Sequence, residues 1–257
     1  MPLRVEFAVI SALVAMCLLM SEPEQAHGED NPAAATPRTY EKKTVEGWTV
    51  QVETSLLKDC PAETELALKL LQQQLQEVVK VVPAPAVEKL RVVTLWFSPL
   101  YPGVRASAEY HPGRQWLVDQ KRNPEMVKGV EFTNIKTFEK ELDRMPNFAL
   151  HELAHAYHDQ VFGFDNDDIA SAYAHAKDSQ SYDNVERWSG TGIPIRREKA
   201  YAMTNPMEYF AETSEAFFTR NDFYPFNHEE LLKHDPEMEK LLTKVWGVVR
   251  TAPATSP

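Results

Sequence analysis

The stretch NFALHELAHAYHDQVFG, residues 147–163, determines how this chain is interpreted. It contains the pattern His-Glu-x-x-His, formed by His151, Glu152 and His155. Residues four apart on a helix lie on one face, so two imidazoles can approach one ion while Glu152 projects beside them. The other positions are largely apolar or aromatic, which predicts a buried helix over Pro146–Phe162. Such a helix holds these polar side chains only if partners offset the cost of burying them.

The same residues match the needs of a hydrolytic zinc site. It requires neutral nitrogen ligands, an open coordination position for water, and a carboxylate that takes the water's proton. The pattern therefore predicts Zn²⁺ held by His151 and His155, with Glu152 as general base. His158 lies about 10 Å along the helix axis from His151, too far to share one ion. The five-residue pattern also arises by chance on exposed helices, so a third ligand has to support it.

The best source of that ligand is KAYAMTNPMEYFAETSEAFF, residues 199–218. Asn205 resembles a helix cap, which places Glu208 in the first turn, either as a metal ligand or as part of a capping box. Glu208, Glu212 and Glu215 share one stripe of an otherwise mostly apolar helix. We expect Glu208 to be the ligand. Glu212 is the next candidate, and otherwise accepts a hydrogen bond from a histidine N–H.

The first half of the chain has strand patterns and one helix. Tyr40–Thr44 and Trp48–Glu53 predict a hairpin around Glu46-Gly47. Pro61–Val82 predicts an amphipathic helix packed on a sheet, and Arg91–Ser98, apolar on both faces, predicts a central strand. The apolar positions assigned to the helix are Leu66, Leu70, Leu75, Val78, Val79 and Val82.

A second hairpin is expected from Ala106–Tyr110 and Gln115–Asp119, which bracket a Pro-Gly turn. After it, Met207–Thr219 and Glu229–Val249 have helical patterns. Strands with one early helix, followed by helices, indicate a single α+β domain rather than alternating βαβ units. The expected architecture is a mixed sheet followed by the active-site helices.

Residues 1–28 have the features of a secretory signal peptide. Arg4 precedes an apolar run over Phe7–Met20, and Ala26 and Gly28 are small residues at the −3 and −1 positions of a cleavage site. The run is shorter than the roughly 20 residues that span a bilayer. We expect a cleaved signal rather than a retained anchor, no stable membrane span, and a secreted, periplasmic or otherwise extracellular protein.

The remaining chain divides into a flexible leader (29–39), one catalytic domain (40–250) and a disordered tail (251–257). Removing the signal peptide removes one basic and three acidic residues, so the net charge of −11 becomes −9. This disfavours nucleic acid as a partner. Cys60 is then the only cysteine, which excludes an internal disulfide, and its position before a proline suggests a helix start.

Together these motifs resemble the gluzincin metallopeptidases, most closely the catalytic domain of anthrax lethal factor and its bacterial relatives. In that family the HExxH helix is followed by a helix with a glutamate ligand in an E-aromatic-aromatic-A-E context, and a tyrosine precedes that glutamate by seven residues. The corresponding segments are His151–His155, Glu208–Glu212 and Tyr201. The resemblance covers roughly residues 145–220.

The resemblance implies a zincin-like fold and Zn²⁺ bound by His151, His155 and Glu208. It also implies Glu152 as general base and Tyr201 near the reacting carbonyl of a peptide or protein substrate. A tyrosine of the core is the alternative for Tyr201. The chain departs from thermolysin, whose ligand glutamate lies closer along the chain and is followed four residues later by an aspartate.

We therefore expect a secreted zinc metalloendopeptidase that hydrolyses peptide bonds with a zinc-bound water. One alternative is a zincin-fold binding or toxin-like module, against which the intact HExxH residues argue. The other is a non-peptidase zinc hydrolase, which would lack a strand able to pair with an extended peptide. Ala106–Tyr110 is the candidate for that strand, and residues 163–200 are a candidate flap.

The remaining polar residues are assigned to the surface. Asp165–Asp168 lacks the glycine and distal glutamate of a calcium loop and is expected to be a solvated turn. Four histidines have no partner at ligand spacing and are expected on the surface or in turns: His111, His175, His228 and His234.

Overall fold

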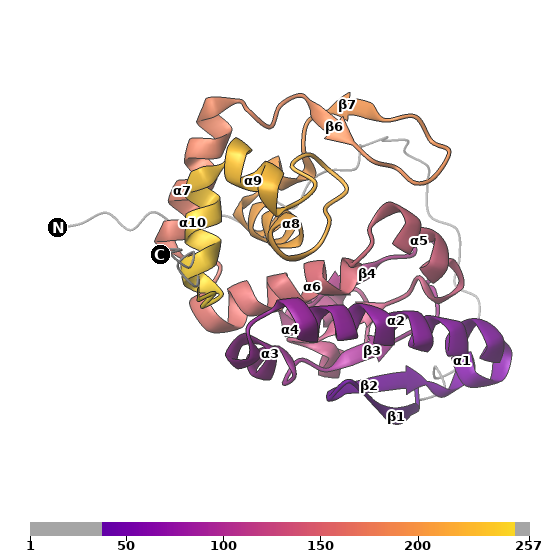
Figure 1. Cartoon of the computed structure of the whole chain (residues 1–257). Coiled ribbons are helices and arrows are strands. Elements are labelled where there is room, and N and C mark those ends of the chain that lie inside the picture. The colour runs from indigo at the N-terminus through magenta and orange to yellow at the C-terminus, as the bar shows by residue number, and fades with distance from the viewer. Residues whose placement is uncertain (1–37, 250–257) are drawn as a thin grey trace, which may run out of the picture. The chain divides into compact units, whose positions relative to one another are not determined.

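The structure, a computed structural model, describes residues 38–249 (Figure 1). The predicted signal peptide, most of the leader and the tail lie outside these residues. Among residues 38–249, no helix is both long and apolar enough to cross a membrane. This part of the chain is α+β, with one five-stranded mixed sheet, a small two-stranded sheet and several helices.

The main sheet has the order β1 (Tyr40–Val45), β2 (Trp48–Glu53), β3 (Leu95–Phe97), β5 (Val130–Phe132) and β4 (Ala108–Tyr110). β1 pairs antiparallel with β2, the strands β2, β3 and β5 are parallel, and β4 is antiparallel to β5 at the edge. The parallel link from β2 to β3 needs a crossover, because a tight turn cannot join parallel strands. That crossover is α1 (Thr54–Asp59), α2 (Pro61–Val81) and α3 (Ala84–Leu90). It forms a βαβ unit that the sequence pattern did not predict.

The predicted first hairpin is confirmed. Glu46 and Gly47 have positive φ angles of 49° and 92°, as a two-residue turn between twisted strands requires. The Glu46 carboxylate accepts hydrogen bonds from Gln72 and Gln76 of α2, which ties the turn to the helix above it.

The predicted helix is confirmed as α2, but its assigned apolar face is partly wrong. Leu66 and Val79 are 41% and 39% exposed, whereas Gln74 is buried. Gln74 Oε1 accepts a hydrogen bond from the Ala149 amide, and the backbone carbonyl of Gln74 accepts one from Asn147 Nδ2. The buried face of α2 is therefore rotated relative to the pattern of apolar residues, and it includes Gln74 with these two hydrogen bonds. Gln74 thereby positions the segment that contains the HExxH motif.

The predicted second hairpin is wrong. Arg114–Asp119 forms the helix α4, with Leu117 buried against Trp96 and Met126. β4 pairs instead with β5, a three-residue strand that the sequence analysis missed. The predicted strand over Arg91–Ser98 is central in the sheet, as expected, but is limited to β3.

The second half of the described chain is mostly helical. Its elements are α5 (Phe138–Arg144), α6 (Phe148–Tyr157), a π-helical turn (His158–Phe162), α7 (Asp167–Ser179), β6 (Val185–Arg187), β7 (Arg196–Glu198), a 3-10 helix η4 (Tyr201–Met203), α8 (Pro206–Phe218), α9 (His228–His234) and α10 (Pro236–Val245). The predicted helices over 146–162 and 207–219 are confirmed. The one predicted over 229–249 is two helices, because Asp235 caps α10 with a hydrogen bond from Met238 N.

The central helix of this arrangement is α6. It contacts α2 and β4 on one side and α8 on the other (Figure 1). All ten of its residues are buried. Its polar side chains therefore face other elements rather than solvent.

Candidate metal centre

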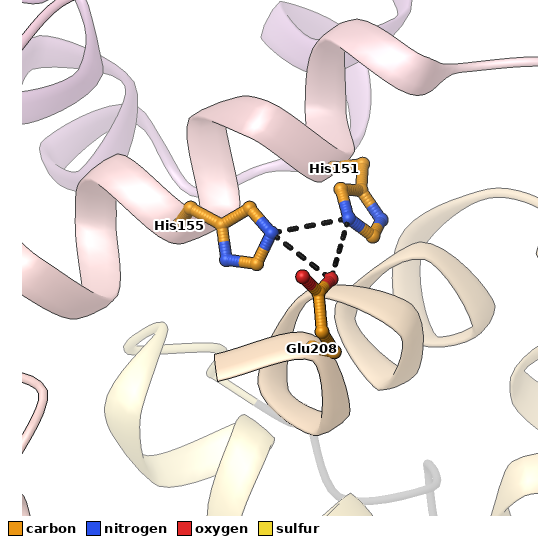
Figure 2. Close-up of side chains that lie close together, drawn as sticks. All are labelled: His151, His155 and Glu208. Atoms are coloured by element: carbon orange, nitrogen blue, oxygen red, sulfur yellow. Dashed lines mark hydrogen bonds and ion pairs between the residues drawn. The ribbon is translucent and has the colours of Figure 1, made fainter. Parts of the chain in front are cut away.

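Three side chains converge between α6 and α8 (Figure 2). His151 Nε2 and His155 Nε2 are 3.1 Å apart, and each lies 3.2 Å from Glu208 Oε2. Tetrahedral zinc ligands with bonds of 2.0–2.1 Å are separated from one another by about 3.3 Å. The triangle of donor atoms thus matches the size of a zinc site. The structure brings together all three residues that the sequence proposed as ligands.

Local sequence fixes the two helices that supply these side chains. The Asn147 side chain caps α6 by accepting from Leu150 N. The Asn205 side chain caps α8 by accepting from Met207 N and Glu208 N. The Glu208 amide bonds to this cap, while the Glu208 carboxylate faces the histidines. Its contacts are with those imidazoles and with Tyr201, so the capping-box alternative is wrong.

The other ring nitrogen of His151 has a buried partner. Nδ1 lies 2.6 Å from Glu215 Oε1, and Glu215 is fully buried. If Nδ1–H donates to this carboxylate, Nε2 keeps a lone pair directed at the triangle. Glu208 Oε2, also an acceptor, faces that lone pair at 3.2 Å. Two acceptors in such contact need a cation or a proton between them.

The carboxylate that contacts His151 Nδ1 belongs to Glu215 and not, as the sequence predicts, to Glu212. Glu212 was expected to accept from a histidine N–H, but its nearest oxygen is 3.9 Å from His151 Nδ1. At 3.6 residues per turn, Glu215 lies only about 20° around α8 from Glu208, whereas Glu212 lies about 40° away on the other side. The His151 ring therefore spans from Glu208 to Glu215. The acidic stripe contained this signal, since all three glutamates are on it.

The charges around the triangle favour positive charge at its centre. Burial alone would lower the pKa of His151, but its contacts with Glu208 and Glu215 outweigh burial and raise that pKa. Burial alone would raise the pKa of Glu208, but the two histidines hold it well below its usual range. Burial raises the pKa of Glu215 to about 7, against the opposing hydrogen bond from His151.

Glu152 lies beside the triangle on α6. Its Oε2 accepts a hydrogen bond of 2.8 Å from the Tyr110 amide of β4. Burial raises the pKa of Glu152, and the charges of His151 and His155 oppose that rise. A carboxylate with one oxygen anchored and a raised pKa is suited to proton transfer.

Tyr201 is at the start of η4, and its hydroxyl lies 3.3 Å from Glu208 Oε1. The residue is 47% exposed, so the alternative of a core tyrosine is wrong. Burial of the hydroxyl end, reinforced by the charge of Glu208, raises the pKa of Tyr201 to about 12. The hydroxyl is therefore protonated at neutral pH and can donate a hydrogen bond.

A cleft of about 460 Å³ is lined by the three residues of the triangle and by Glu152, Tyr201 and Glu212, but not by Glu215. The segment from Arg105 through β4 contributes to its lining, as do Tyr201, Asp222 and Phe223. Ser107 O accepts a hydrogen bond from Thr133 N, and His111 N donates one to Gly129 O, so both groups point toward β5. Because these directions alternate along an antiparallel strand, the backbone groups of Ala108 and Tyr110 point away from the sheet. Ala108 thus offers an unpaired edge to the cleft.

The remaining histidines differ from one another. The surface assignment is wrong for His111, which is buried with Nε2 3.0 Å from Glu131 Oε2. His175 and His228 are exposed as expected, while His234 is half-buried. His158 is buried, neither ring nitrogen has a hydrogen-bond partner among the described residues, and burial lowers its pKa to about 4.

Other assignments agree with the structure. Asp165, Asp167 and Asp168 are exposed around the start of α7, which is a solvated turn as predicted. Cys60 is buried and directly precedes α2. Residues 163–200 contain α7 and the β6–β7 hairpin, and their role as a flap stays a prediction.

Comparison of the chain with protein-family models, curated proteins and solved structures finds no match. The chemistry of the site is therefore inferred from its own residues and their geometry.

Proposed function

We propose that this chain is a secreted zinc-dependent endopeptidase with a zincin-type active site. The observation that carries the proposal is the triangle formed by His151, His155 and Glu208, with Glu152 beside it, in a cleft bounded by a free strand edge. The resemblance to gluzincins supports the same function.

The donor set suits zinc better than other common metals. Two imidazole nitrogens and one carboxylate oxygen are typical of catalytic zinc sites, whereas calcium and magnesium prefer oxygen ligands alone. The bond to Glu215 orients His151 with its lone pair toward the ion, as metal-bound histidines require. Bound there, zinc supplies a Lewis acid that polarises a carbonyl and lowers the pKa of water to about 7.

In this mechanism Glu152 moves the proton. Its Oε2 is held by the Tyr110 amide, which leaves Oε1 to take a proton from the attacking water and pass it to the departing amine. The raised pKa of Glu152 suits both steps, because a weaker acid accepts the proton more readily and still releases it to an amine.

Tyr201 is proposed to stabilise the oxygen that becomes negative as the peptide carbonyl is attacked. Its protonated hydroxyl lies at the rim of the triangle, beside Glu208. A hydrogen-bond donor held at such a position stabilises the transition state more than the substrate.

The edge of β4 favours a peptide over a smaller substrate. An extended chain can pair with the outward-facing backbone of Ala108 and thereby bring its amide bonds past Glu152. A hydrolase acting on other substrates has no use for such an edge, and a binding module has no use for a positioned general base.

Metal analysis of the purified mature chain, combined with digestion of a peptide library, tests the function. Zinc near one per chain together with cleavage supports the proposal, and zinc without cleavage favours the non-peptidase alternatives. The Glu152→Gln variant should keep its zinc and lose roughly 10²-fold or more in kcat, because the amide accepts no proton. Loss of zinc from this variant would contradict the assignment of Glu152.

A further inference from the structure

A second cavity adjoins the cleft next to β4. This side pocket has a volume of about 340 Å³ and shares Ala106 and Asn134 with the cleft. Its apolar lining consists of Leu56, Cys60, Pro99, Leu100, Ala106 and Ile135. Leu100, at 53% exposed, is a large aliphatic side chain left partly in water. Covering such a side chain with an apolar group is favourable.

At the junction of the two cavities, Asn134 has an incompletely bonded side chain. The residue is 2% exposed, and its Oδ1 has no hydrogen-bond partner among residues 38–249. Its backbone carbonyl accepts from Thr137 N, which holds the residue in place. Buried polar atoms are rarely left without partners. An amide offers both an acceptor and donors, which match the N–H and C=O of a peptide main chain.

The spacing along β4 relates the side pocket to the metal centre. Tyr110 marks the position of Glu152, and Ala106 lies four residues earlier, about 13 Å away at roughly 3.3 Å per residue. A peptide that extends the sheet in antiparallel orientation runs opposite to β4, so its C-terminal part points toward Ala106. Its residue opposite Ala106 is then four or five positions beyond the cleaved bond.

We propose, resting on the peptidase function above, that the side pocket is a specificity subsite for one large apolar side chain. That side chain belongs to the substrate residue four or five positions C-terminal to the cleaved bond. Asn134 binds the substrate main chain as it passes from the cleft into the side pocket. The substrate class is thus an extended peptide with an aromatic or large aliphatic residue at this position.

Two peptide sets that differ at one position test the subsite. Each set varies a single residue, at the fourth or the fifth position after the cleaved bond, through Phe, Leu, Ala and Asp. In at least one set, kcat/KM should be about tenfold or more higher for Phe or Leu than for Asp, as expected for one apolar contact. The Leu100→Asp variant should bring this ratio close to one. Val92→Asp is the matched control, because Val92 is 72% exposed and lines neither cavity.

Main-chain recognition gives a different pattern. Asn134→Ala should lower kcat/KM for every peptide of the set by a similar factor, about tenfold. The lost hydrogen bonds do not depend on the side chain at the varied position. A preference for Phe that survives Leu100→Asp, or equal rates for all four residues in both sets, would overturn the subsite.

A binding experiment separates this proposal from the peptidase function. The zinc-loaded Glu152→Gln chain is titrated with labelled Phe and Asp peptides and followed by fluorescence anisotropy. Tighter binding of the Phe peptide without any cleavage by the wild type would refute the peptidase and retain the subsite. Cleavage by the wild type with equal binding of the peptides would retain the peptidase and refute the subsite.

Discussion

Two buried clusters of histidine and carboxylate side chains lie beside β4, and they differ in how their charges are balanced. One is the metal centre between α6 and α8. The other, the Glu131 cluster, consists of Glu131, His111, Arg122, Tyr101 and Glu109. Val130 and Phe132 belong to the main core, so the intervening Glu131 points to the opposite face of the sheet.

The Glu131 cluster is complete within the chain. The buried Glu131 carboxylate accepts from Tyr101 OH at 2.7 Å and contacts His111 Nε2 and Arg122, each at 3.0 Å. Burial would raise the pKa of Glu131, but hydrogen bonds, above all the one with His111, outweigh it and lower that pKa. Arg122 also pairs with Glu109 at 2.6 Å. Every strong acceptor has a donor, and a cation is already present.

The metal centre is incomplete by the same test. His151 Nε2 and Glu208 Oε2, both acceptors when Nδ1 donates to Glu215, face each other. Among residues 38–249, no arginine or lysine forms an ion pair with this triangle, while Arg122 fills the equivalent place in the other cluster. The contrast indicates that a histidine near a carboxylate carries little functional information by itself. The informative feature is a set of converging acceptors with neither an arginine nor a lysine between them.

The largest expected effect is at Glu208. Glu208→Ala should lower zinc affinity by orders of magnitude, because it removes one of three ligands while Asn205 still caps α8. The measurement is competition for zinc with a chelating dye. Glu109→Ala is the matched control from the balanced cluster and should bind zinc as the wild type does. Equal affinity in the two variants would place the third ligand elsewhere.

Breaking the Glu131 cluster should affect stability and not metal binding. Glu131→Ala leaves Arg122 and His111 buried without their main partner, which should cost about 3–5 kcal/mol in the free energy of unfolding. Urea denaturation measures that loss, and zinc content of the folded fraction should remain near that of the wild type. A folded variant that loses its zinc would show that the two clusters are coupled.

The two tyrosines that contact glutamates sharpen the comparison. Tyr201→Phe should lower kcat by an amount on the order of 2.7–4 kcal/mol in activation free energy, with zinc content and thermal stability nearly unchanged. Tyr101→Phe should lower thermal stability and leave kcat nearly unchanged, since among residues 38–249 its hydroxyl bonds to Glu131 and to the neighbouring Arg38. Wild-type kcat in Tyr201→Phe would end the catalytic assignment of Tyr201.

Local sequence rules predicted the parts of the fold that are locally determined. The first hairpin follows from its turn, and the helices α2, α6 and α8 follow from their periodicity and caps. Features that depend on distant partners were missed. β5 is three residues long and has no periodicity of its own, and Arg114–Asp119 becomes a helix because Leu117 packs against Trp96 and Met126.

The candidate site shows the same limit at the scale of one helix. Spacing within the chain was sufficient to propose His151, His155 and Glu208 as neighbours, because two of them share a helix face and the third begins a buried helix. Spacing could not decide which glutamate of α8 contacts His151 Nδ1. That choice depends on the rotation of α8 against α6, which the packing of both helices determines.

The smallest expected effect tests that last choice. Glu215→Gln should weaken zinc binding by about 10- to 100-fold, because the amide holds the His151 ring less firmly and makes its nitrogen less basic. Glu212→Gln should change the affinity less, since its nearest oxygen lies 3.9 Å from Nδ1. Both residues are buried, so the pair controls for the replacement of a buried carboxyl group by an amide. Dye competition at one pH compares them, and thermal denaturation of the zinc-free proteins separates metal affinity from general stability. If Glu212→Gln has the larger effect on affinity, Glu212 is the acceptor when zinc is bound, and α8 must shift relative to α6 to bring it there.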